Sequence, residues 1–271
     1  MNRRCFLVAC PSLVLAGCAR LSAPPTLPVG HSTVFDQLVI YSDFPLPRQH
    51  RLFDELVALR GHVADTLDLP PGEEPIHVYL FKNEHRYKAF MLKHYPDFPQ
   101  RRAFFVETDT RLEVYAHWGD RVAEDMRHEV SHGYLHAVVP NLPLWLDEGL
   151  AEYFETPRGA GGFHRQHARH LAEQVAAGWR PDVKRLGRLT SVPELTQLDY
   201  AESWAWVHYL LHHEPAGRKL LADHLQSLRT TRRARPLSAR LRELRFDPDR
   251  TLLEYIRSFK LSDETDESKE K

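Results

Sequence analysis

The chain contains an H-E-x-x-H pattern, His128-Glu129-Val130-Ser131-His132, whose residue types and spacing could bind a metal ion. On a helix, His128 and His132 lie four residues apart and share a face, so both imidazoles can bind one zinc ion. Glu129 beside them can accept a proton from water that the zinc acidifies. Histidine is frequent, with 17 among 271 residues, yet this composition predicts only about 0.08 accidental matches to the pattern.

A zinc hydrolase of this kind needs a third protein ligand and an open position for water. Glu148 follows the pattern within residues 145–154, WLDEGLAEYF, which read as part of a second helix. The sequence therefore predicts one zinc ion held by His128, His132 and Glu148. The alternative is a surface helix that carries solvated histidines.

The helix that carries the pattern is expected over residues 120–139, from the stop signal at Gly119-Asp120 to Pro140. The second ligand helix is expected over residues 143–156. Ahead of both, hydrophobic periodicity predicts further elements: strands at 34–41, 76–81, 103–107 and 111–117, and helices at 48–67 and 84–93.

After the ligand helices the pattern is mainly helical. The sequence predicts an α+β fold with a small N-terminal sheet lobe at residues 34–156, a helical lobe at residues 157–261, and the zinc cleft between them. His164, His167 and His170 are interpreted as a solvated or mixed helix face rather than a secondary metal site. His136 is interpreted as structural, because a fourth protein ligand would close the open position.

The two ligand segments together resemble the gluzincins, zinc metallopeptidases with an H-E-x-x-H helix and a glutamate ligand on the next helix. WLDEGLAEYF is similar to the "WLNEGFA" segment of aminopeptidase N-type enzymes, and closer to the P-x-W-L-x-E-G-L-A-E-Y-F stretch of bacterial peptidase-MA-like proteins. The resemblance covers about residues 34–211 and implies a thermolysin-like catalytic unit. The spacing before Glu148 is shorter than in the large aminopeptidases and no G-x-M-E-N motif is present, so endo- or exopeptidase activity stays open.

The resemblance implies roles for further residues. Glu129 would be the general base, and Tyr200 would donate its hydroxyl to the tetrahedral oxyanion, the alternative being a core or capping tyrosine. A strand ahead of the metal helix pairs with substrate in gluzincins; residues 111–117 are placed for that role, or only complete the sheet. Helical spacing, independently of the resemblance, predicts that Glu152, four residues after Glu148 and near the same face, accepts a hydrogen bond from a ligand imidazole; the alternative is a solvated glutamate.

Residues 1–17 are typical of a bacterial lipoprotein signal peptide, with Arg3 and Arg4 before a short apolar run. The run ends at Cys18, which would carry acyl chains; a secretory signal with an incidental cysteine is the alternative. Residues 18–33 predict a tether and residues 262–271 a disordered tail. The expected location is the cell envelope, lipid-anchored and facing the periplasm, with the outer membrane preferred.

These predictions combine into a membrane-anchored zinc peptidase acting on a peptide or protein substrate. Two other interpretations stay open: a catalytically inactive zinc-binding lipoprotein that acts as an interaction module, and an envelope scaffold without metal. A formal net charge of −1 argues against a nucleic-acid partner. The basic residues 218–250 are interpreted as a solvated helix face rather than a lipid contact. The substrate and the oligomeric state stay open.

Overall fold

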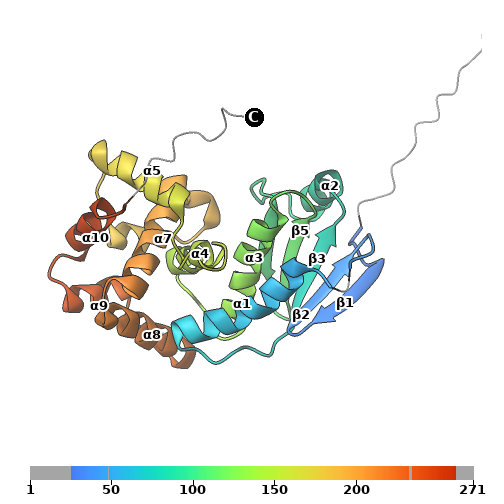
Figure 1. Ribbon diagram of the computed structural model, residues 1–271, viewed down its shortest axis with the longest axis horizontal. Helices are drawn as coiled ribbons and strands as arrows, with labels where there is room; N and C mark the ends of the chain where they lie inside the picture. Colours follow the sequence, from blue (N-terminus) through green and yellow to red (C-terminus); the bar gives the residue numbers. More distant parts are fainter. Residues whose placement is uncertain (1–25, 48, 232–233, 261–271) are drawn as a thin grey trace, which may run out of the picture.

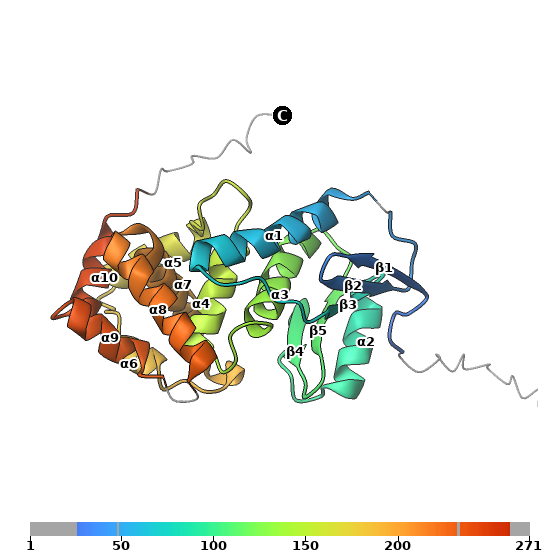
Figure 2. The same cartoon turned by 90° about the horizontal axis from the view of Figure 1, so that it is seen from below.

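The computed structural model describes residues 26–47, 49–231 and 234–260 (Figure 1). The predicted signal peptide, the lipidation site Cys18 and the predicted tail lie outside these residues. A small mixed sheet occupies one end of the molecule and a group of helices the other (Figures 1 and 2). The predicted α+β class is confirmed.

Five strands form one sheet in the order β1-β2-β3-β5-β4. Their bounds are β1 His31–Phe35, β2 Leu38–Ser42, β3 Ile76–Phe81, β4 Ala103–Glu107 and β5 Leu112–His117. The central strands β2, β3 and β5 run parallel, whereas β1 and β4 are antiparallel to their neighbours. The sheet has two edge strands, β1 and β4, and β4 is the one that packs against the helix with the H-E-x-x-H pattern.

The single strand predicted over residues 34–41 is wrong, because the chain turns back at Asp36. Asp36 adopts a positive φ of 52°, a conformation that aspartate tolerates better than most residues. The result is the hairpin of β1 and β2. Since β1 begins at His31, the sheet lobe starts within the stretch 18–33 predicted as a tether.

Helices cover both faces of the sheet and build the second lobe. Their bounds are α1 Arg51–Leu67, α2 Glu84–His94, α3 Val122–His136, α4 Leu144–Phe154, α5 Arg165–Ala176, α6 Val183–Leu186, α7 Gln197–His212, α8 Pro215–Thr230, α9 Leu237–Leu244 and α10 Pro248–Arg257, with a short 3-10 helix η1 at Val192–Glu194. Among the described residues, no helix combines the length and the apolar character needed to cross a bilayer.

The alternation of side chains along β3 separates two hydrophobic clusters. Ile76, Val78 and Leu80 join the main core beneath α1 and α3, whereas Tyr79 and Phe81 face α2 in a smaller aromatic cluster. Successive strand side chains point to opposite faces. Apart from His77, this strand is therefore covered on both sides, and α3 packs on a rigid layer.

Two glycines let the ligand helices approach their supports closely. A Cβ atom at Gly133 of α3 would lie 2.8 Å from Ile76 Cδ1, and one at Gly149 of α4 would lie 2.5 Å from the backbone oxygen of Ser203 in α7. The first contact holds α3 against the sheet. The second holds α4, between α3 and α7 (Figure 2), at the residue next to Glu148.

We expect Gly149→Ala to destabilise the protein by roughly 1–3 kcal/mol, because the new methyl group would overlap helix backbone that cannot move independently. Gly61→Ala is the matched control: Gly61 lies in α1 with no atom within 4 Å of its Cβ position. That change should stabilise by about 0.5–1 kcal/mol. Urea unfolding midpoints test both. Equal midpoints for Gly149→Ala and the unaltered chain would contradict the close packing of α4 on α7.

Candidate metal centre

The structure brings the side chains of His128, His132 and Glu148 to a single point between α3 and α4. The two Nε2 atoms lie 3.3 Å apart. Glu148 Oε2 lies 3.5 Å from His128 Nε2 and 3.7 Å from His132 Nε2. Tetrahedral zinc with bonds of about 2.0–2.1 Å places its ligand atoms about 3.3–3.4 Å apart. The three atoms therefore lie close to the separation that one zinc ion requires.

Each ligand imidazole is oriented by a carboxylate on its other ring nitrogen. His128 Nδ1 lies 2.9 Å from Glu155 Oε2, and His132 Nδ1 lies 2.9 Å from Asp147 Oδ1. An ionised carboxylate can only accept, so in each ring Nδ1 carries a proton and donates, which leaves Nε2 as the nitrogen available to a metal ion. This arrangement fixes the tautomer that metal binding needs.

The prediction that Glu152 orients a ligand imidazole is wrong, since Glu155 makes that contact. Glu155 follows Glu148 by seven residues and lies about 20° from it around the helix axis, whereas Glu152 is displaced by about 40° in the other direction. Glu152 Oε2 instead lies 2.7 Å from His167 Nε2. Both carboxylates belong to the face that follows Glu148, but the hydrogen bond to the His128 ring comes from Glu155.

The surroundings of the Glu148 carboxylate indicate whether the site suits a cation. Its Oε2 atom is buried and has no hydrogen-bond partner among the described residues. The ring nitrogens nearest to it are the two Nε2 atoms, whose lone pairs also point into the gap. Leaving a buried carboxylate oxygen without a partner is costly, and a cation at this point would satisfy all three atoms. The residues therefore fit a metal ion.

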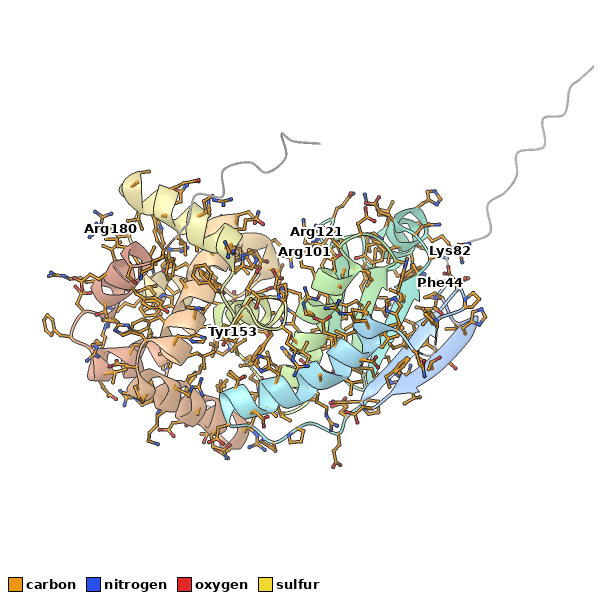
Figure 3. The ribbon with its side chains drawn as sticks, in the orientation of Figure 1. Phe44, Lys82, Arg101, Arg121, Tyr153 and Arg180 are labelled. Atoms are coloured by element: carbon orange, nitrogen blue, oxygen red, sulfur yellow. The ribbon has the colours of Figure 1, made fainter. Side chains whose placement is uncertain are left out.

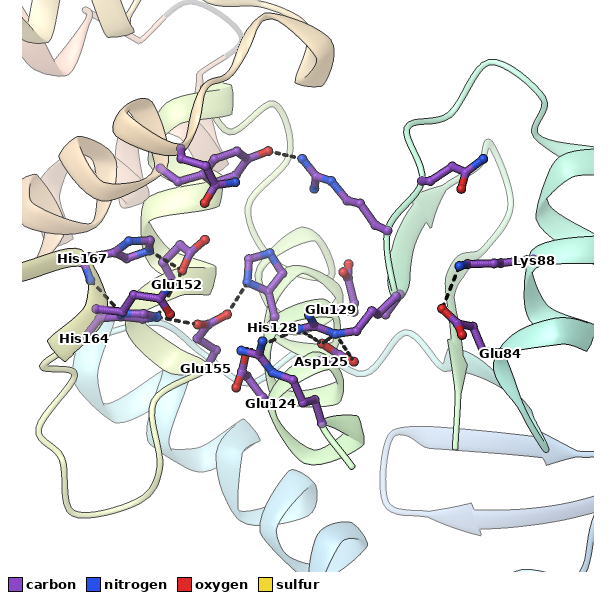
Figure 4. Close-up of a pocket in the computed structure, with 18 residues that line it drawn as sticks. Glu84, Lys88, Glu124, Asp125, His128, Glu129, Glu152, Glu155, His164 and His167 are labelled. Carbon is purple, nitrogen blue, oxygen red and sulfur yellow. Dashed lines mark hydrogen bonds and ion pairs between the residues drawn. The ribbon is translucent and has the colours of Figure 1, made fainter. Parts of the chain in front are cut away.

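Glu129 and His128 line the same open cleft, of about 490 Å³, between the two lobes (Figure 4). Burial raises the pKa of Glu129, an effect that the charges of His128 and His132 oppose. A carboxylate with a raised pKa is a stronger proton acceptor. Glu129 is thus beside the metal ligands, accessible from the cleft and suited to accept a proton.

Tyr200, in the first turns of α7, lines the same cleft and contacts Arg101. The Arg101 guanidinium donates to the Tyr200 hydroxyl and lies 5.3 Å above its ring. Burial and the charge of Glu148 raise the pKa of Tyr200 to about 12, although Arg101 opposes the shift. Arg101 lies at the boundary between the lobes (Figure 3). Arg101 could not be predicted from the sequence, because the irregular segment before β4 has no motif.

His136 continues the row of histidines on α3 but turns away from Glu148. Its Nε2 lies 3.0 Å from Asp147 Oδ2, and its Nδ1 lies 2.7 Å from Glu107 Oε2. Burial alone would lower the pKa of His136, but the two carboxylates outweigh it and raise this pKa to about 10. A charged His136 holds Asp147 in place, and Asp147 in turn orients His132.

The strand predicted to pair with a substrate, residues 111–117, cannot do so at a free edge. β5 is hydrogen-bonded to β3 on one side and to β4 on the other. The free edge is β4, whose Phe105 ring stacks on the His132 ring with centroids 5.7 Å apart. An edge strand beside the metal ligands is present, but it is the other strand of the predicted hairpin.

His164, His167 and His170, predicted as a solvated or mixed helix face, form a mixed one. His167 is buried, and the His164 and His167 rings stack with centroids 3.9 Å apart. Their Nε2 atoms face the carboxylates of Glu155 and Glu152, respectively (Figure 4). The buried position results from the packing of α5 on α7, which periodicity alone does not reveal.

We expect Glu155→Gln to weaken zinc binding roughly 10- to 100-fold, because the neutral amide holds the His128 imidazole less strongly than the carboxylate does. Glu152→Gln is the matched control on the same helix: Glu152 hydrogen-bonds His167, so with at most one equivalent of zinc the affinity of the His128–His132–Glu148 site should stay unchanged. Competition for zinc against a chromogenic chelator measures both. An unchanged zinc affinity in Glu155→Gln, or a lowered zinc affinity in Glu152→Gln, would contradict the assignment of Glu155 as the residue that orients His128.

A family model described as a protein of unknown function (DUF1570) matches residues 123–237. The match begins at the start of α3 and includes α4 and Tyr200, so it contains the three ligand residues and the general-base candidate. No curated protein matches the chain. The family's description assigns no activity, and what the site can do must follow from its chemistry.

Proposed function

We propose that the protein is a zinc-dependent peptidase of the gluzincin type. The observation that carries this proposal is the convergence of His128 Nε2, His132 Nε2 and Glu148 Oε2 at 3.3–3.7 Å. Two imidazoles and one carboxylate suit zinc and leave one coordination position open. A buried carboxylate, Glu129, and a hydroxyl, Tyr200, face the same cleft.

The chain would contribute ligands, a base and oxyanion donors. Zinc held by the three ligands would polarise a peptide carbonyl and increase the acidity of water. Glu129 would accept the proton of the attacking water and transfer it to the departing amine. Its burial supports this role, since a raised pKa favours proton acceptance near neutral pH.

Tyr200 and Arg101 would stabilise the negative charge that develops on the carbonyl oxygen. The Tyr200 oxygen accepts a hydrogen bond from Arg101, so its own proton stays free to donate to a substrate. The guanidinium adds positive charge close to the same oxygen. Donors placed before the reaction, in a site with little water, stabilise such charge more effectively than solvent does.

The free edge of β4 supports an extended peptide as the substrate. An extended chain can add to a sheet edge through main-chain hydrogen bonds. Phe105 of β4 contacts the rings of both His132 and His136, so a peptide along this strand would run beside the ligands. The side chains of such a peptide would extend into the cleft, whose volume of about 490 Å³ can accommodate them.

We also propose that the protein is held at a membrane of the bacterial envelope by acyl chains on Cys18. The support is the sequence pattern of residues 1–18 alone. With about a dozen residues between Cys18 and β1, such an anchor would keep the cleft within reach of the membrane surface.

Glu129→Gln should keep its zinc and lose roughly 100- to 10,000-fold in turnover, because an amide cannot accept the water proton. Cleavage of a randomised peptide library, read by mass spectrometry, is the measurement, with zinc content determined on the same sample. Glu124→Gln is the control, since Glu124 lies on the same helix but pairs with Arg121 and Arg102. Equal turnover in Glu129→Gln would exclude the mechanism. Zinc without turnover in the unaltered protein would favour the inactive zinc-binding alternative.

Tyr200→Phe should lower kcat roughly 100- to 1,000-fold with little change in zinc content, because one oxyanion donor is lost. Tyr209→Phe serves as the control: Tyr209 is a buried tyrosine of the same helix that packs on Trp206 and Tyr255. Full turnover in Tyr200→Phe would remove Tyr200 from the mechanism and leave it as a structural partner of Arg101.

A further inference from the structure

A second group of metal-ligand side chains lies in the cleft beside the proposed zinc site. Glu152 Oε2 is 2.7 Å from His167 Nε2 and 3.8 Å from His164 Nε2. One ligand atom from each of the three residues lies within 4.8 Å of the others. The donor types, two imidazoles and one carboxylate, are the same as those of His128, His132 and Glu148.

We propose that Glu152, His164 and His167 hold a second divalent transition-metal ion of the zinc type. Imidazole and carboxylate together favour zinc or its neighbours in the first transition series over magnesium or calcium, which prefer oxygen ligands. All three residues line the cleft that also contains His128 and Glu129. The second ion would therefore face the same substrate as the first.

The charges around this group favour a cation. Glu152 and Glu155 are both only 9% exposed, and their side-chain oxygens face imidazole nitrogens. Three basic side chains along the cleft have acidic partners of their own: Lys88 pairs with Glu84, Arg102 with Asp125 and Arg121 with Glu124. A fourth, Arg101, contacts Tyr200 instead. Two buried carboxylates face this group of imidazoles, so a cation placed among them would be stabilised by their charge.

The hydrogen bonds of His164 predict that the second ion binds less tightly than the first. His164 Nδ1 accepts the backbone N–H of His167 at 3.2 Å and caps α5. Its proton is therefore on Nε2, which donates to Glu155 at 2.8 Å. To bind a metal through Nε2, the ring must move its proton to Nδ1 and give up the cap. No such rearrangement is needed at His128 or His132.

Glu155 connects the two groups (Figure 4). One of its oxygens lies against His128 Nδ1 and the other against His164 Nε2. An ion that takes His164 Nε2 frees one oxygen of Glu155, and this changes how the carboxylate holds His128. Binding at one group must then alter binding at the other by the same factor, because the coupling is reciprocal.

The test is metal stoichiometry on the purified protein, first stripped with a chelator and then titrated with Zn²⁺, with Co²⁺ absorption as a second readout. We expect two equivalents to bind, the second more weakly. His167→Gln should reduce the total to one equivalent and leave the tighter binding in place. His170→Gln, three residues further along α5 and outside the group, should still bind two. His132→Ala should lose the tighter equivalent.

One equivalent in the unaltered protein at saturating Zn²⁺ would overturn the proposal and mean that protonated imidazoles balance Glu152 and Glu155. Two equivalents that persist in both His167→Gln and Glu152→Gln would also overturn it. Glu152→Gln provides a second variant that leaves the cap of α5 intact. The proposed peptidase site is tested separately, by whether the tighter equivalent of zinc binds and whether it is lost in His132→Ala. The two proposals can therefore fail independently.

Discussion

The candidate metal centre depends on hydrogen bonds from imidazole Nδ1 atoms to two carboxylates, one in α4 and one on its C-cap residue. Because Asp147 and Glu155 each engage the Nδ1 atom of one ligand ring, the Nε2 lone pairs of His128 and His132 converge on Glu148. Without these two carboxylates, the rings could rotate or take the other tautomer, and three ligand atoms would no longer meet. The centre therefore depends on how α4 lies against α3.

That relation between α3 and α4 is set by packing at some distance from the ligands. Gly133 brings α3 close to the β3 side chain Ile76, and Gly149 brings α4 close to the backbone of α7. Gly133 follows His132, and Gly149 follows Glu148. Because neither glycine has a side chain, each helix can pack closely on its support directly beside a ligand residue. A closely packed interior resists small displacements. The packing of the core in both lobes therefore fixes the positions of the ligand atoms.

The ligand residues could be predicted from the helical period. The residues around them could not, because these depend on tertiary contacts. His128 and His132 share a face in any helix, and the second helix follows directly. Choosing Glu155 over Glu152 depends on where α3 lies, since both glutamates are within about 40° of Glu148 around the axis. Arg101 carries no local signal, and its partner Tyr200 is 99 residues away in the chain.

The two sides of the cleft present different side chains, and this difference affects how a peptide would lie in it. The wall from α4 and α5 presents carboxylates and imidazoles, including Glu152 and His167. From the opposite side, the segment before β4 extends the Arg101 guanidinium across the cleft onto the ring of Tyr200 in α7. Positive potential stabilises a carbonyl oxygen as it gains charge, and negative potential stabilises a cation. A peptide extended along β4 would then direct its reacting carbonyl towards Arg101 and Tyr200, leaving the acidic wall for metal ions or basic substrate groups.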